Sequence, residues 1–181
     1  NLLITFHPVT LENNNSKKDF QILLNTLNEI DDIYLIFTMP NADSNSRIIK
    51  LMIQTFVSKN SERSISFKSM GRVNYLSTMR FVDAVIGNSS SGIIEAPTFK
   101  KGTINIGDRQ KGRIQASSII NCKPTKPLIA KAINTLYSKE YQASLSSVIN
   151  PYGRGGASNK IVEILREIKL PLELKKEFYD L

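Results

Sequence analysis

Short apolar segments alternate along this chain with stretches whose apolar side chains recur at helical spacing. Residues 2–6 form the first such segment, and an apolar stripe at i, i+3, i+4 and i+7 follows over residues 20–27. Unbroken apolar strands are typical of parallel sheets that helices cover on both faces. Because the strand–helix unit repeats, the sequence predicts an α/β fold with a doubly wound, Rossmann-like parallel sheet.

The same spacing places the individual elements. Strands are expected at Leu2–Phe6, Ile33–Phe37, Ile65–Phe67, Ala84–Ile86 and Thr103–Ile106, with Ser118–Cys122 as a candidate sixth. Helices are expected over 20–27, 48–59, 74–81, 127–136 and 161–168, with a short one after Gly92. Ligands of doubly wound sheets bind beyond the carboxyl ends of the strands, so the loops that follow the first five strands are the expected position of a site.

Composition excludes several classes of protein and of site. The chain has 181 residues, 41% of them hydrophobic and 22% charged, which indicates one globular domain or at most two small ones. Its longest apolar run, Ile33–Phe37, is far shorter than the ~20 residues of a membrane-spanning helix. One cysteine, Cys122, and one histidine, His7, cannot form an internal disulfide or a Cys/His zinc cluster, so we expect no metal or cofactor. The first residue is Asn1, and we expect the chain to begin inside a longer polypeptide.

The positive charge is unevenly distributed. A net charge of +8 and an isoelectric point near 9.6 raise nucleic acid as a partner, yet the basic residues form no polybasic arm. Between Lys100 and Lys126, seven basic residues stand against one acidic residue, Asp108. This segment therefore carries most of the excess, either as a solvated basic face or as part of a site for an anion.

A serine-rich turn follows the fourth expected strand. The segment Gly87–Pro97 reads GNSSSGIIEAP, which is a strand end, a small polar loop and a helix start. Backbone N–H groups at such a helix start favour anions, and small side chains let a phosphate come close. An ordinary strand-to-helix turn with serine caps would use the same residues.

Glu95 and Arg109 favour the phosphate interpretation. A carboxylate at Glu95 would repel a diphosphate unless it faced the adjoining sugar, where it could accept hydrogen bonds from two ribose hydroxyls. Its alternative role is to stabilise the helix dipole. The next strand-end loop, Asn105–Arg113, reads NIGDRQKGR, so Arg109 could bind two phosphate oxygens with its planar fork.

This order of motifs resembles hydrolysing UDP-N-acetylglucosamine 2-epimerases. The motifs that carry the resemblance are FHPVT at Phe6–Thr10, Pro40–Asn41, GNSSSGIIEAP at Gly87–Pro97, NIGDRQKGR at Asn105–Arg113 and YGRGGA at Tyr152–Ala157. The resemblance implies the C-terminal half of a two-domain GT-B fold. Residues 1–170 would form the nucleotide-binding domain, and 171–181 a tail helix whose apolar surface packs toward the absent N-terminal domain.

Carried over residue by residue, the resemblance implies a UDP site. Ser89 and Ser90 would bind the diphosphate, and Arg109 would pair with it. Glu95 would hold the uridine ribose. His7 would lie near the diphosphate and the interdomain cleft, where it would act as a catalytic cation or proton donor for the leaving phosphate.

Four further residues complete the implied site. Asn41 would line the nucleotide site, and Tyr75 would lie beside the uridine, although a ring in a helix that packs on the sheet is an equal alternative. Arg113 and Arg154 would be cations behind the phosphate contacts. No metal or cofactor takes part.

The resemblance also implies the reaction. UDP is eliminated between C2 and C1 to give a 2-acetamidoglucal, and water then adds to yield N-acetylmannosamine with inversion at C2. The general base and acid would be carboxylates of the N-terminal domain, so we expect this chain alone to bind UDP or a UDP-N-acetylhexosamine weakly without turnover. The complete enzyme would be a cytoplasmic homo-oligomer that supplies nonulosonic acid synthesis. A UDP- or GDP-linked 2,4-diacetamido-6-deoxy sugar is the alternative substrate.

Three other functions stay open. A non-hydrolysing 2-epimerase usually carries an acidic, glycine-rich version of the serine loop and Arg-Pro-Glu in place of GDRQ. Another GT-B enzyme, a glycosyltransferase, would modify an acceptor sugar. A basic domain for RNA or DNA would show an affinity that falls steeply with salt and ignores UDP; we expect neither a nucleic-acid nor a membrane partner.

Overall fold

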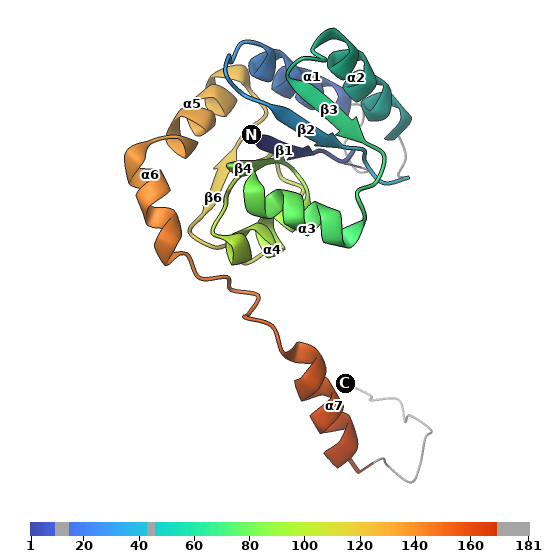
Figure 1. Ribbon diagram of the computed structural model, residues 1–181, viewed down its shortest axis with the longest axis vertical. Coiled ribbons are helices and arrows are strands. Elements are labelled where there is room, and N and C mark those ends of the chain that lie inside the picture. The colour runs from blue at the N-terminus through green and yellow to red at the C-terminus, as the bar shows by residue number, and fades with distance from the viewer. Residues whose placement is uncertain (10–14, 43–45, 170–181) are drawn as a thin grey trace, which may run out of the picture.

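Parallel strands form the centre of the molecule (Figure 1), in a computed structural model that describes residues 1–9, 15–42 and 46–169. The strands of this described part are β1 (Leu2–Thr5), β2 (Leu35–Thr38), β3 (Ser64–Phe67), β4 (Ala84–Gly87), β5 (Gly102–Ile106) and β6 (Ile119–Cys122). Their order in the sheet is β3-β2-β1-β4-β5-β6, and every neighbouring pair is parallel. The predicted α/β fold with a doubly wound parallel sheet is confirmed.

Helices cover both faces of this sheet (Figure 1). One face packs against α1 (Asn15–Asn28), α2 (Ser46–Lys59) and α5 (Lys126–Leu136). The other face packs against α3 (Gly71–Phe81), α4 (Ser90–Ile94) and the 3-10 helix η1 (Ala96–Phe99). Beyond α5 the chain forms α6 (Lys139–Ser144), η2 (Leu145–Ser147) and α7 (Ala157–Glu167).

The central strand β1 is buried on both faces. Leu2 and Ile4 belong to the core shared with α1, α2 and α5, whereas Leu3 packs with Met79 of α3 on the opposite face. These three residues of β1 are at most 1% exposed. Successive side chains of a strand point to opposite faces, so a strand covered twice requires an uninterrupted apolar sequence.

Two of the differences from the predicted helices have identifiable causes. The helix expected after Gly92 starts earlier, at Ser90, because the Ser89 Oγ accepts a hydrogen bond from the Ser91 N–H (3.4 Å) and caps the first turn. Helix α6 was not predicted, since its six residues carry no apolar stripe. Its first turn is stabilised instead by the Oγ of Ser138, which accepts from the Tyr141 N–H.

The last described helix lies apart from the sheet. Every residue from 151 to 169 is exposed, and Figure 1 shows α7 projecting from the domain at the end of an extended segment. The expected apolar stripe at 161, 164, 165 and 168 is 54–67% exposed. The predicted tail helix at 171–181 lies outside the described residues. No helix in the described part of the chain has the length and hydropathy of a membrane span.

Strands β1 and β4 end side by side where the strand order reverses. The chain leaves β1 toward α1 and leaves β4 toward α4, which lie on opposite faces, so a crevice opens between the two loops. Gly87 at the end of β4 has a φ of 140°, and a Cβ there would lie 2.0 Å from the Thr5 carbonyl oxygen. Glycine alone permits this approach of the two strand ends.

Replacement of this glycine should separate the strand ends. We expect Gly87→Ala to lower the free energy of unfolding by about 3 kcal/mol or more, because the methyl group meets backbone rather than a movable side chain. Urea denaturation followed by circular dichroism measures the loss. Gly112→Ala is the control: its φ of 84° is also positive, but nothing lies within 4 Å of its Cβ, and we expect a loss of about 1 kcal/mol. Equal losses would contradict the close approach.

Candidate functional site

A cavity of about 440 Å³ lies at the carboxyl ends of β1, β2 and β4. The residues that line it include six of those expected at a nucleotide site: His7, Asn41, Tyr75, Ser89, Ser90 and Arg109. They come from the loops after β1, β2, β4 and β5 and from helices α3 and α4. The sheet topology thus gathers side chains that are far apart in the sequence at the point where the strand order reverses.

The carboxamide of Asn88 holds the loop after β1 against the loop after β4. Its Oδ1 accepts from the His7 N–H (2.7 Å), and its Nδ2 donates to the His7 carbonyl oxygen (2.8 Å). The Asn88 N–H donates to the Thr5 carbonyl oxygen (3.2 Å). Asn88 is 2% exposed, and a buried polar group with its partners in place fixes one geometry. The serine turn therefore has a defined position relative to His7.

Asn88 also orients the loop after β5. Its carbonyl oxygen accepts hydrogen bonds from the Arg109 guanidinium (3.1 Å) and from the Gln110 carboxamide (2.8 Å). Gln110 is buried, whereas Arg109 is exposed and lines the cavity. The bond to Asn88 thus fixes the direction of a guanidinium whose planar fork suits phosphate oxygens.

His7 lies almost entirely below the surface and is 6% exposed. The Asn41 N–H donates to its Nδ1 over 3.5 Å. With Nδ1 as the acceptor, Nε2 is the ring nitrogen that can donate. His7 is therefore held at two points: the Asn88 side chain bonds its backbone, and the Asn41 backbone N–H bonds its ring.

The serine turn presents its three hydroxyl groups around the start of α4. Ser89, Ser90 and Ser91 are half-buried and all line the cavity. The Ser89 Oγ accepts the capping hydrogen bond from the Ser91 N–H. The Ser89 hydroxyl proton takes no part in this bond and can be donated to another group. Sequence reasoning singled out Ser89 and Ser90 but left out Ser91.

Glu95 lies at the end of α4 rather than within it. Helix α4 ends at Ile94 and Glu95 is its C-cap residue, because Pro97 cannot continue the helix. Glu95 is absent from the cavity lining, but burial raises the pKa of its carboxyl above the ordinary value, and a backbone hydrogen bond and the charge of Arg72 lower it by less. Its Oε2 is buried and has no hydrogen-bond partner within the described residues.

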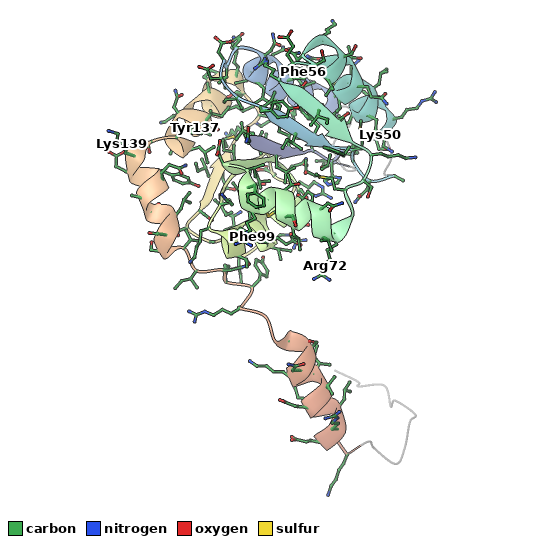
Figure 2. The ribbon with its side chains drawn as sticks, in the orientation of Figure 1. Lys50, Phe56, Arg72, Phe99, Tyr137 and Lys139 are labelled. Carbon is green, nitrogen blue, oxygen red and sulfur yellow. The ribbon has the colours of Figure 1, made fainter. Side chains whose placement is uncertain are left out.

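Two cations that the sequence did not single out also line the cavity. Lys68 and Arg72 follow β3, and Figure 2 shows Arg72 at the start of α3. Their position after the third strand, where a site was expected, was the available signal. The structure does not bring Arg113 or Arg154 to the cavity, since both are exposed and neither lines it.

Tyr75 contacts the other residues of the site through its hydroxyl. Its ring packs against the buried cluster that contains Leu3 and Met79. The hydroxyl is hydrogen-bonded to the Ser91 Oγ and lies 3.5 Å from the Thr5 Oγ1. The residue therefore combines core packing with a polar contact to the serine turn.

The sequence matches the family model described as UDP-N-acetylglucosamine 2-epimerase over residues 1–166. The chain belongs to this 2-epimerase family. The match spans every strand of the sheet and every residue that lines the cavity. Within the described part of this 2-epimerase chain, no group of three His, Cys, Asp or Glu residues could hold a metal ion.

Curated relatives include epimerases named as hydrolysing. The chain is 42% identical over 180 residues to the GDP/UDP-N,N'-diacetylbacillosamine 2-epimerase (hydrolyzing) of Campylobacter jejuni, which covers 99% of the chain and 46% of that protein. It is 34% identical over 181 residues to polysialic acid biosynthesis protein P7 of Escherichia coli, with coverage of 99% and 46%. It is 29% identical over 168 residues to the UDP-N,N'-diacetylbacillosamine 2-epimerase (hydrolyzing) of Legionella pneumophila, with coverage of 93% and 43%. The chain thus spans less than half the length of these relatives.

Solved 2-epimerase structures share the fold. The Methanocaldococcus jannaschii UDP-GlcNAc 2-epimerase in complex with UDP-GlcNAc and UDP matches with a TM-score of 0.71 at 19% identity, over 91% of this chain and 44% of that one. The S. aureus MnaA–UDP co-structure matches with a TM-score of 0.69 at 18% identity and the same coverage. The expectation of one half of a GT-B fold is confirmed.

The Asn88 contacts make a direct prediction for stability. Asn88→Ala should lower the free energy of unfolding by about 2–4 kcal/mol, because it removes both hydrogen bonds between the Asn88 carboxamide and the buried backbone of His7. Chemical denaturation measures the change. Asn41→Ala is the matched control, since Asn41 is exposed and contacts His7 through its backbone N–H, and we expect less than about 0.5 kcal/mol. A similar small loss for both variants would refute the bridging role of Asn88.

Proposed function

We propose that this chain binds the nucleotide of a UDP-N-acetylhexosamine in a hydrolysing 2-epimerase. The observation that carries the proposal is the convergence of Ser89, Ser90, His7 and Arg109 on one cavity where the strand order reverses. Hydroxyl donors and a guanidinium that line the same cavity match a diphosphate, whose oxygens are acceptors only. The names of the hydrolysing relatives support the same reaction class.

Each end of the nucleotide has a group suited to it. The diphosphate would contact Ser89, Ser90 and Arg109, and the cations Lys68 and Arg72 would add charge around it. Glu95 lies outside the cavity lining, and its buried Oε2 has no donor in the described residues. We propose that the ribose binds beside this carboxyl, where a ribose hydroxyl would be the donor. Asn41 and Tyr75 would lie along the remaining wall, and Arg113 and Arg154 would contribute only at longer range.

The reaction needs a leaving diphosphate, a base and an acid. His7 would stabilise the charge that develops on the leaving phosphate as the C1–O bond breaks, by donating from its ring. UDP would leave as the C2 proton is removed, and water would add to the resulting 2-acetamidoglucal to give N-acetylmannosamine. We assign the base and the acid to the part of the family's length that this chain does not span.

Titration of this chain with UDP, UMP, GDP and uridine tests the proposal. Calorimetry should show UDP binding more tightly than UMP, and UMP more tightly than uridine, because the phosphates supply most contacts. We expect Arg109→Ala to weaken UDP binding about 10-fold while leaving uridine unchanged. The matched control is Lys111→Ala, an exposed cation of the same loop outside the cavity lining.

Two outcomes would count against these assignments. Equal affinities for UDP and uridine would overturn the diphosphate site, and preference for GDP would move the assignment to a guanine nucleotide. Hydrolysis of UDP-N-acetylglucosamine by this chain alone would show that the base and acid do not lie elsewhere.

At neutral pH, Glu95→Gln should raise the stability of the chain and lower its affinity for UDP. Burial raises the pKa of Glu95, so folding disfavours its ionised form. The variant should therefore be more stable than the parent above the raised pKa, and the gain should vanish once the pH falls below the ordinary carboxyl pKa, where both folded and unfolded states are protonated. UDP affinity should fall about 5-fold at neutral pH, because a carboxylate accepts from ribose hydroxyls more strongly than an amide.

Denaturation at neutral and acidic pH measures the first effect of Glu95→Gln, and calorimetry at neutral pH measures the second. Glu140→Gln, in the exposed first turn of α6, is the control and should change neither quantity. Unchanged UDP affinity in Glu95→Gln would remove Glu95 from the ribose contacts.

A further inference from the structure

Four hydroxyl groups form a continuous chain beside the cavity. The Thr38 Oγ1 and the Thr5 Oγ1 are 2.7 Å apart, and the Tyr75 hydroxyl lies 3.5 Å from the Thr5 Oγ1. The Tyr75 hydroxyl is in turn hydrogen-bonded to the Ser91 Oγ. All four residues line the cavity, and they connect β2, β1, α3 and α4.

The ring and the hydroxyl of Tyr75 have separate surroundings. The half-buried ring packs against the cluster of Leu3, Met79 and Val85 on the sheet. The part of Tyr75 that reaches the serine turn is its hydroxyl. A Tyr75→Phe variant would therefore keep the packing and remove only the link between Thr5 and Ser91.

Proton counting leaves one hydroxyl proton of this chain outside its three links, and two of the possible arrangements run in a single direction. Each hydroxyl carries one proton and can donate once. In one polarity Ser91 donates to Tyr75, Tyr75 to Thr5, and Thr5 to Thr38, whose proton goes to the Ile4 carbonyl oxygen (3.5 Å). No proton of the chain then faces the cavity.

The opposite polarity changes what the cavity offers. Thr38 donates to Thr5, Thr5 to Tyr75, and Tyr75 to Ser91, so every link is still made. The proton left over is that of Ser91, whose hydroxyl lines the cavity. Hydrogen-bonded chains polarise one another, so an anion beside Ser91 would favour this second arrangement along the whole chain.

We propose that Tyr75 is a positioning residue for phosphate binding: it donates to Ser91 and so commits the Ser91 proton to a phosphate oxygen. Ser91 becomes a third serine contact beside Ser89 and Ser90. The inference rests on the proposed function, because the anion is the diphosphate assigned there. It gives the Tyr75 hydroxyl a role at the phosphate end of the nucleotide.

A double-mutant cycle on this chain tests the inference. Calorimetry measures UDP affinity for the parent, Tyr75→Phe, Ser91→Ala and the double variant, and NMR titration measures uridine. We expect each single variant to weaken UDP binding about 3- to 10-fold and to leave uridine unchanged. The double variant should match Ser91→Ala, because without the Ser91 hydroxyl Tyr75 has nothing to position.

The control is Tyr34→Phe, which removes a tyrosine hydroxyl outside the cavity lining and should leave UDP affinity unchanged. Near-ultraviolet circular dichroism checks that each variant keeps its packing. Unchanged UDP affinity in Tyr75→Phe, or additive losses in the double variant, would overturn the inference while the proposed function stands. Failure of the parent chain to bind UDP would overturn the proposed function and this inference together.

Discussion

The hydrogen bonds of Asn88 are the constraint on which the site depends. Through its side chain this residue satisfies both backbone polar groups of His7, and through its carbonyl oxygen it receives Arg109 and Gln110. Asn88 thereby holds the loops after β1, β4 and β5, which are separate in the sequence, in one arrangement. Because Gly87 lets the ends of β1 and β4 approach closely, these bonds form in a buried place where water does not compete with them.

Positive charge gathers around the cavity, and a partly buried carboxyl lies outside the cavity lining. Lys68, Arg72 and Arg109 bring positive charge to one cavity. Glu95 is partly buried with an unpartnered oxygen, and burial raises its pKa. Such a carboxylate opposes folding slightly at neutral pH. Groups poised to meet a ligand commonly carry this kind of cost, which binding of the ligand removes.

Much of the fold and part of the site were predictable from local sequence. Strands β1, β2 and β4 were predictable because each is a short, mostly apolar run, and the serine turn because Gly87 and the small residues after it end a buried strand. The helix boundaries were less predictable, since Ser89 caps α4 and Pro97 ends it through contacts that spacing does not show. The apolar stripe of α7 formed its helix as expected, yet it is exposed in a chain that spans less than half of its relatives' length.

The sequence by itself determined the parallel sheet, the position of the serine and arginine loops at strand ends, and the family to which the chain belongs. Periodicity and motifs are local features of the sequence, so they can be recognised without a structure. Only the tertiary structure decided which loops meet. It joined His7 to Arg109 through Asn88, added Lys68 and Arg72, and left Arg113 outside. Those outcomes depend on strand order and on buried hydrogen bonds between distant segments, which no single stretch of sequence specifies.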